Sequence, residues 1–115
     1  MGQTRAPWPP ELDGVVAAPD HHRVLFENDE VRVIETVVTA GDRTPVHTHP
    51  RTLMYVVSGR HFVRRDEGGQ VLVDTREEGP DHELPRVLWS DGTPPHVIEN
   101  PCEEDLVVIG VELKR

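Results

Sequence analysis

The stretch Gly41-Asp-Arg-Thr-Pro-Val-His47-Thr-His49-Pro50, with Tyr55-Val-Val-Ser-Gly59 shortly after it, decides the fold. His47 and His49 stand two residues apart in a segment without a helical pattern. Side chains of an extended strand alternate between its two faces, so both imidazoles project from the same face. Imidazole is a common ligand of transition metals. The stretch therefore predicts a strand that carries two neighbouring metal ligands.

Short apolar, β-branched segments surround this stretch and are separated by turn residues every 8 to 12 positions or so, a pattern typical of all-β sandwiches and barrels. We predict an all-β barrel of two packed antiparallel sheets over residues 21–115, after an extended, proline-rich arm over residues 1–20. The alternation in the last segment predicts that one apolar set faces the core. That set is Val107, Ile109, Val111 and Leu113.

A third histidine occurs much later, in His96-Val-Ile-Glu-Asn100, on a segment that also looks extended. The order Gly-x5-His-x-His, then a hydrophobic strand ending in Gly59, resembles the first motif of the cupins, and His96-x3-Asn100 resembles the end of their second motif. The resemblance covers about residues 23 to 114. It implies a double-stranded β-helix, or jelly-roll, barrel.

The sequence departs from the cupin pattern at two places. The first motif usually supplies a glutamate ligand seven residues before its last glycine, where this chain has Thr52, followed by Leu53. In the second motif, Pro94 and Pro95 occupy the turn between Gly92 and the histidine. The resemblance therefore implies His47, His49 and His96 as ligands, with the fourth position empty.

Three neutral imidazoles leave the charge of a divalent ion uncompensated and leave coordination positions open. We therefore expect a divalent transition metal as cofactor and a small, anionic, chelating molecule as ligand. The ligand set suits iron, manganese, nickel, copper and zinc alike.

Other residues receive weaker predictions. His61 follows the Gly59 turn and is an exposed residue or a further ligand; Tyr55 and Trp89 belong to the core or line the ligand cavity with a polar tip. These three are the candidate substrate-binding residues. The remaining histidines are expected to be exposed: His21, His22 and His82. No catalytic residue is identified, and the acidic neighbours of Cys102 disfavour a thiolate nucleophile there.

Composition limits the possible partners. The 115 residues carry 12 Lys and Arg against 21 Asp and Glu, a net charge of −9 that opposes binding to nucleic acid or to an anionic membrane surface. The single cysteine favours a reducing cytoplasm. A small barrel exposes edge strands, and Trp8 in the arm could lie across a neighbouring subunit, so a homodimer is expected.

Two functions remain open at this point. One is a small metal-dependent enzyme of the dioxygenase or isomerase type that acts on a small anion. The other is a binding protein, with or without metal, that holds a small ligand without turning it over. They share the fold, and fold alone does not decide function.

Overall fold

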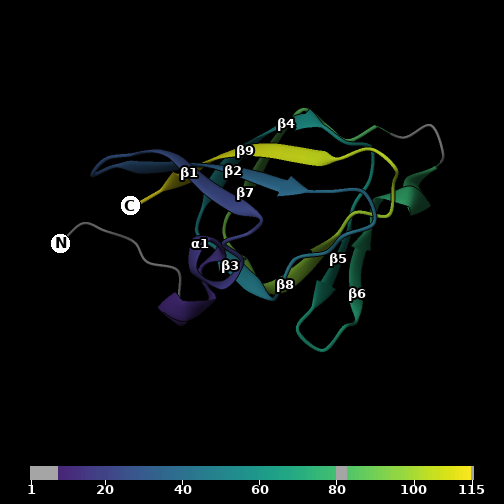
Figure 1. Cartoon of the computed structure of the whole chain (residues 1–115), viewed down its shortest axis with the longest axis horizontal. Coiled ribbons are helices and arrows are strands. Elements are labelled where there is room, and N and C mark those ends of the chain that lie inside the picture. The colour runs from purple at the N-terminus through teal and green to yellow at the C-terminus, as the bar shows by residue number, and fades with distance from the viewer. Residues whose placement is uncertain (1–7, 80–82, 115) are drawn as a thin grey trace.

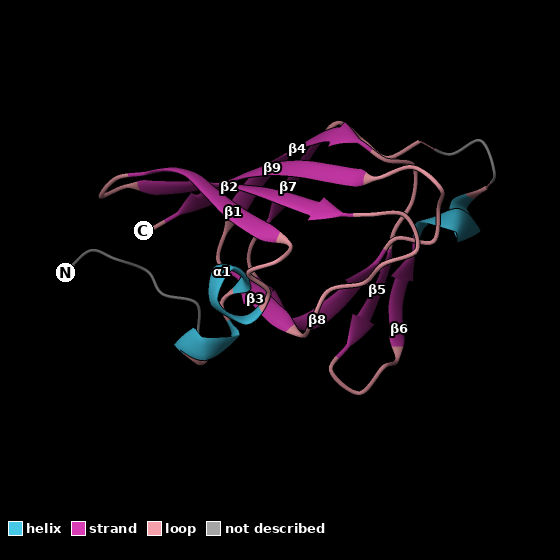
Figure 2. Cartoon of the chain, in the orientation of Figure 1, coloured by secondary structure: helices cyan, strands magenta, loops and turns pink. Residues whose placement is uncertain are grey.

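The computed structural model describes residues 8–79 and 83–114 and forms a flattened barrel of two antiparallel sheets (Figure 1). Helical turns are few and short (Figure 2). They are η1 (Pro10–Leu12), α1 (Gly14–Ala17) and η2 (Thr75–Glu78). The strands are β1 (His22–Glu27), β2 (Val31–Val38), β3 (His47–His49), β4 (Thr52–Ser58), β5 (Val63–Asp66), β6 (Val71–Asp74), β7 (Val87–Ser90), β8 (Thr93–Glu99) and β9 (Leu106–Leu113). The prediction of an all-β fold with two sheets is confirmed.

One sheet has five strands in the order β1-β2-β9-β4-β7, and the other has four in the order β3-β8-β5-β6. The first two strands form a hairpin, in which the Asn28 side chain accepts hydrogen bonds from the backbone N–H groups of Glu30 and Val31. The last strand, β9, lies between β2 and β4 at the centre of the larger sheet. Long-range pairing therefore fixes the barrel, because β2 and β9 lie far apart in sequence.

The apolar core fills one end of the space between the sheets. Its buried members are Val38, Val56, Leu84 and Leu106, with the partly buried Phe62, Leu88, Ile98 and Val108 packed against them. The turn at Gly59 closes on this core with φ +119°, and a Cβ there would meet Leu106 Cδ1 at 2.7 Å. Glycine is therefore required at this position, because other residues rarely adopt that backbone conformation and would also clash.

The predicted inward set of β9 is wrong. Glu112 is 2 % exposed and Leu106 is 4 % exposed, whereas Ile109 and its outward neighbours are only half-buried. The apolar stripe of β9 instead joins those of the adjacent strands. We call the resulting surface the outer sheet face, and its members are Phe26, Val33, Val37, Leu53, Tyr55, Val57, Val87, Trp89, Val107, Ile109 and Val111.

The beginning of the chain folds onto its own barrel. An extended arm was expected over residues 1–20, but Pro10–Leu12 and Gly14–Ala17 form helical turns, and Asp13 makes a parallel bridge to Thr48 of β3. Trp8 lies beside Gly92 of the same chain, and residues 1–7 are outside the described part. Figure 1 shows α1 beside β3. Within the described residues, no helix is long and apolar enough to cross a membrane.

Candidate metal centre

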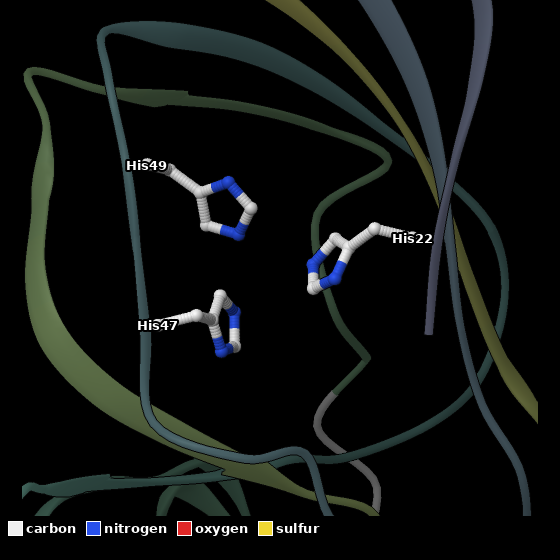
Figure 3. A group of neighbouring side chains, drawn as sticks. All are labelled: His22, His47 and His49. Carbon is white, nitrogen blue, oxygen red and sulfur yellow. The ribbon is translucent and has the colours of Figure 1, made fainter. Parts of the chain in front are cut away.

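Four histidines gather at the end of the barrel opposite the apolar core. His22 begins β1, His47 and His49 form the two ends of β3, and His96 lies on β8 directly opposite His47. Figure 3 shows that the rings of His22, His47 and His49 point toward one another. The i, i+2 spacing on β3 places its two rings on one side, as predicted, and topology brings the other two to them.

The distances within this histidine cluster are short. One ligand nitrogen from each of His22, His47 and His49 can be chosen so that all three lie within 4.8 Å of one another. The ring centroid of His96 is 4.3 Å from that of His47 and 5.7 Å from that of His49. Imidazole rings bound to one ion lie at comparable separations, since each nitrogen sits about 2.0–2.1 Å from the metal.

Hydrogen bonds fix the tautomer of each ring. The Nδ1 atoms of His47 and His96 donate to the carbonyl oxygens of Pro45 and Pro94, both at 2.8 Å. His22 Nδ1 donates in the same way to Ala18 O at 3.0 Å. A carbonyl only accepts, so each Nδ1 carries the proton and each Nε2 keeps its lone pair. This orientation by outer partners is usual for histidines that bind metals.

The fourth ring is oriented by a carboxylate. His49 Nδ1 donates to Glu112 Oε2 at 3.1 Å. Glu112 Oε1 accepts from Arg32 Nε at 2.7 Å, and Arg32 Nη2 donates to both oxygens of Asp13 at 2.9 Å. A continuous chain of charged groups therefore runs from the turn between η1 and α1 to the histidine cluster.

Burial keeps three of the four histidines neutral. Desolvation, with a further contribution from the charge of His49, lowers the pKa of His22 to about 4, of His47 to about 2 and of His96 to about 3. Burial by itself raises the pKa of Glu112, but the hydrogen bond from His49 and the charge of Arg32 outweigh it, so the net shift is downward. Near neutral pH these three residues thus offer uncharged imidazoles, the form that binds metal.

Helix α1 packs closely against the histidine cluster at Gly14. A Cβ built on Gly14 would lie 2.8 Å from His49 Cε1 and 3.3 Å from His22 Nε2. Only a residue without a side chain leaves these two rings undisturbed. The N-terminal helical turn therefore forms one wall of the centre.

His22 is the residue that the sequence analysis missed. The expectation that it is exposed is wrong, since it is 4 % exposed and its Nε2 is buried without a hydrogen-bond partner. The related expectation for His21 is also wrong, because its side chain is 13 % exposed and hydrogen-bonded to Asp42 at 2.9 Å. His82 lies outside the described residues. No local pattern marks His22, because only the packing of the five-stranded sheet against the four-stranded one brings it to β3.

The candidate substrate-binding residues lie elsewhere. Tyr55 and Trp89 are 52 % and 50 % exposed on the outer sheet face, so the alternative that they belong to the core is wrong. His61 is buried, bonds Thr75 Oγ1 at 3.0 Å and lines a separate hollow with Cys102. The alternation of β4 turns Tyr55 away from the barrel interior and Thr52 toward it.

Thr52 and Leu53, which stand where the cupin motif has its glutamate, supply no metal-binding side chain. Leu53 is 45 % exposed on the outer sheet face, and the buried Thr52 hydroxyl donates to Pro50 O at 2.7 Å. Thr52 faces Glu112 across the β4–β9 ladder. A carboxylate therefore does lie close to this corner of the barrel, but it comes from the last strand and bonds a histidine.

The cluster fits a divalent transition metal. The unpaired, buried Nε2 of His22 is costly without a partner, and a metal ion would satisfy it together with the other Nε2 lone pairs. Imidazole ligands suit late transition metals better than calcium or magnesium, which prefer oxygen.

No protein-family model matches the chain, and no curated protein matches its sequence. Solved structures do resemble it. A cupin domain from Bordetella pertussis Tohama I has 20% identity and a TM-score of 0.66, over 82% of this chain and 92% of that one. A predicted oxalate decarboxylase from Thermotoga maritima has 20% identity and a TM-score of 0.54, over 82% and 79% of the two chains.

A polyketide cyclase from Streptomyces resistomycificus has 17% identity and a TM-score of 0.56, over 86% of this chain and 68% of that one. At identities this low, the structural similarity establishes only the architecture, and these neighbours share it. This chain has two antiparallel sheets, and the histidine cluster lies between them. The chain therefore has the double-stranded β-helix fold of the cupins.

Proposed function

We propose that the chain binds one divalent transition metal in its histidine cluster and presents it to a small anionic molecule, as a metal-dependent enzyme of the dioxygenase or isomerase type. The observation that carries this proposal is the set of oriented imidazoles around the unpartnered Nε2 of His22. His22, His47 and His49 would hold the ion, with His96 beside them. The ion would supply positive charge and Lewis acidity to a bound anion.

The chain's own residues prepare the centre for this role. Glu112 and two backbone carbonyls fix the ring orientations, so that little rearrangement is needed when the site fills. Arg32 offsets only part of the negative charge of this network, because it pairs with both Glu112 and Asp13. A site without a carboxylate ligand remains attractive to anions.

A binding protein without turnover is the second candidate, and one observation favours it. Glu112, the buried carboxylate beside the cluster, is already engaged by His49 and Arg32 and is poorly placed to move protons to a ligand. Two structural neighbours are named as enzymes, a predicted decarboxylase and a cyclase, which favours the enzyme. Turnover assays with small carboxylic acids would discriminate the two candidates.

Metal analysis of untagged protein tests the shared part of both candidates. Wild-type protein should hold close to one equivalent of a transition metal, and His47→Ala and His22→Ala should each lose most of it. His61→Ala and His21→Ala are matched controls, because these partly or fully buried histidines lie outside the cluster, and they should retain the metal. Equal metal content in all five proteins would refute the site.

We also propose that a second copy of this chain covers the outer sheet face. Stable interfaces bury about 800 Å² on each partner, and the outer sheet face carries half-exposed apolar side chains across five strands. The carboxylate of Glu35 on this face is paired with Arg23 at 2.9 Å, which lowers the electrostatic cost of bringing two chains of net charge −9 together here. The lone cysteine, Cys102, is consistent with a cytoplasmic location.

A further inference from the structure

Arg64 of β5 points into the barrel on the same side as the histidine cluster. It pairs with Ile98 of β8, and Asp66, two residues on, pairs with His96. Paired residues of an antiparallel ladder share a face, and so do residues two apart. Ile98 belongs to the core, and the Arg64 guanidinium lies 5.6 Å from the ring of Phe62, another residue packed against the core. These three observations agree that Arg64 faces inward: its pairing with Ile98, the pairing of Asp66 with His96, and its contact with Phe62.

This cation has no protein counter-ion among the described residues. Its Nε is buried without a hydrogen-bond partner, and no carboxylate of the described chain forms an ion pair with it. The next residue, Arg65, faces the opposite way and pairs with Glu99 at 3.3 Å. The strand therefore carries one neutralised arginine outside the barrel and one unneutralised arginine inside it.

The environment of Arg64 disfavours the charge of its guanidinium. Burial lowers the pKa of its guanidinium. Its partner on β8, Ile98, stands two residues from His96 and therefore on the same face of that strand. A buried cation without a partner is expensive in a protein interior, and an anionic ligand would remove that cost.

We propose that Arg64 binds the carboxylate of a small anionic ligand whose other end lies at the histidine cluster. This inference deepens the proposed function and rests on it for the position of the second end. The planar guanidinium offers its donors in a fork that matches the two oxygens of a carboxylate. Arg64 would select the charge and shape of the ligand, while the histidines would hold the metal.

Titration of the cobalt-loaded protein with simple carboxylates tests the assignment. The probes are formate, malonate and benzoate, with malonamide as the uncharged match of malonate and inorganic phosphate as the alternative anion. Visible absorption of Co²⁺ and calorimetry report binding without any activity assay. Arg64→Gln should bind Co²⁺ as the wild type does, within about twofold, but should bind the best carboxylate ten- to a hundredfold more weakly. Arg64→Lys should lie between them, because it keeps the charge and loses the fork.

Arg65→Gln is the matched control, since it removes the same charge from the same strand on the opposite face. It should leave carboxylate affinity unchanged. Equal carboxylate affinity in wild type and Arg64→Gln, tighter binding of phosphate than of every carboxylate, or no binding of any carboxylate would overturn the assignment. If the wild type holds no Co²⁺, the metal proposal fails on its own. Calorimetry on the metal-free protein then decides: carboxylate binding that Arg64→Gln removes still supports Arg64, and its absence refutes it.

Discussion

The barrel interior around the histidine cluster is rich in polar side chains, and the outer sheet face is rich in apolar ones. Most proteins show the reverse distribution. The interior buries His47, Thr52, Glu112 and other polar groups, whereas the outer sheet face exposes Tyr55 and Trp89 by about half. Ordinary solubility would place the polar groups outside. Each region is therefore costly in free energy in the isolated, unliganded chain, and each would gain stability from the partner proposed for it.

The two regions are the two sides of the same strands. On β4, Thr52 and Val56 face inward while Leu53 and Tyr55 face outward, and on β9 Glu112 and Ile109 divide in the same way. The inner partner would be a metal with its ligand, and the outer partner a second copy of the chain. Changes on either face should therefore affect different measurements, which makes the comparison testable.

Metal binding should give the largest effect. An ion that binds only the folded state at a thousand times its dissociation constant stabilises it by about 4 kcal/mol. Chelation of the wild type should therefore lower its unfolding temperature by several degrees, measured by scanning calorimetry. His47→Ala should unfold at the same temperature with and without chelator. A chelator effect that survives in His47→Ala would place the stabilising ion elsewhere.

The outer sheet face should give the next largest effect. Tyr55→Glu with Val87→Glu places two charges at paired positions of β4 and β7, and each would be buried without a partner in a dimer. We expect dimer affinity, measured by analytical ultracentrifugation, to fall by roughly a hundredfold or more while metal content is unchanged. Val16→Glu is the control, because Val16 is 60 % exposed on α1, away from this face. A monomeric wild type would contradict the proposed partner.

The same two-sidedness explains what could be predicted from the sequence. Period-two patterns and turn residues give the strands, and the motif spacing gives His47, His49 and His96, because these signals are local. The inward face of β9 was predicted wrongly because the rule assigns the apolar set to the core, and here Val111 faces outward while Glu112 faces inward. His22 reaches the histidine cluster only through the packing of the two sheets, which one sequence does not reveal.

Glu112→Gln should give a smaller effect on the inner region. The substitution keeps the size of the side chain but weakens the hydrogen bond that orients His49 and leaves Arg32 with only Asp13. Loss of such an outer partner typically costs ten- to a hundredfold in metal affinity. Competition with a chromophoric chelator measures it, and Glu99→Gln, which loses the ion pair with Arg65, is the control. Equal affinities in the two variants would show that Glu112 does not orient the ligand.

Gly14→Ala should give the smallest effect. Its Cβ would lie 2.8 Å from His49 Cε1, so the ring must shift by some tenths of an ångström, and metal affinity should fall a few-fold, less than for Glu112→Gln. Alanine also favours a helix over glycine by about 1 kcal/mol, so the metal-free protein should lose little stability. Val16→Ala raises helix propensity in the same turn without approaching the histidines, and it should leave metal affinity unchanged. Neither variant should change the affinity of the dimer through the outer sheet face. If Gly14→Ala bound metal as tightly as Val16→Ala, the N-terminal turn would not constrain the histidine rings.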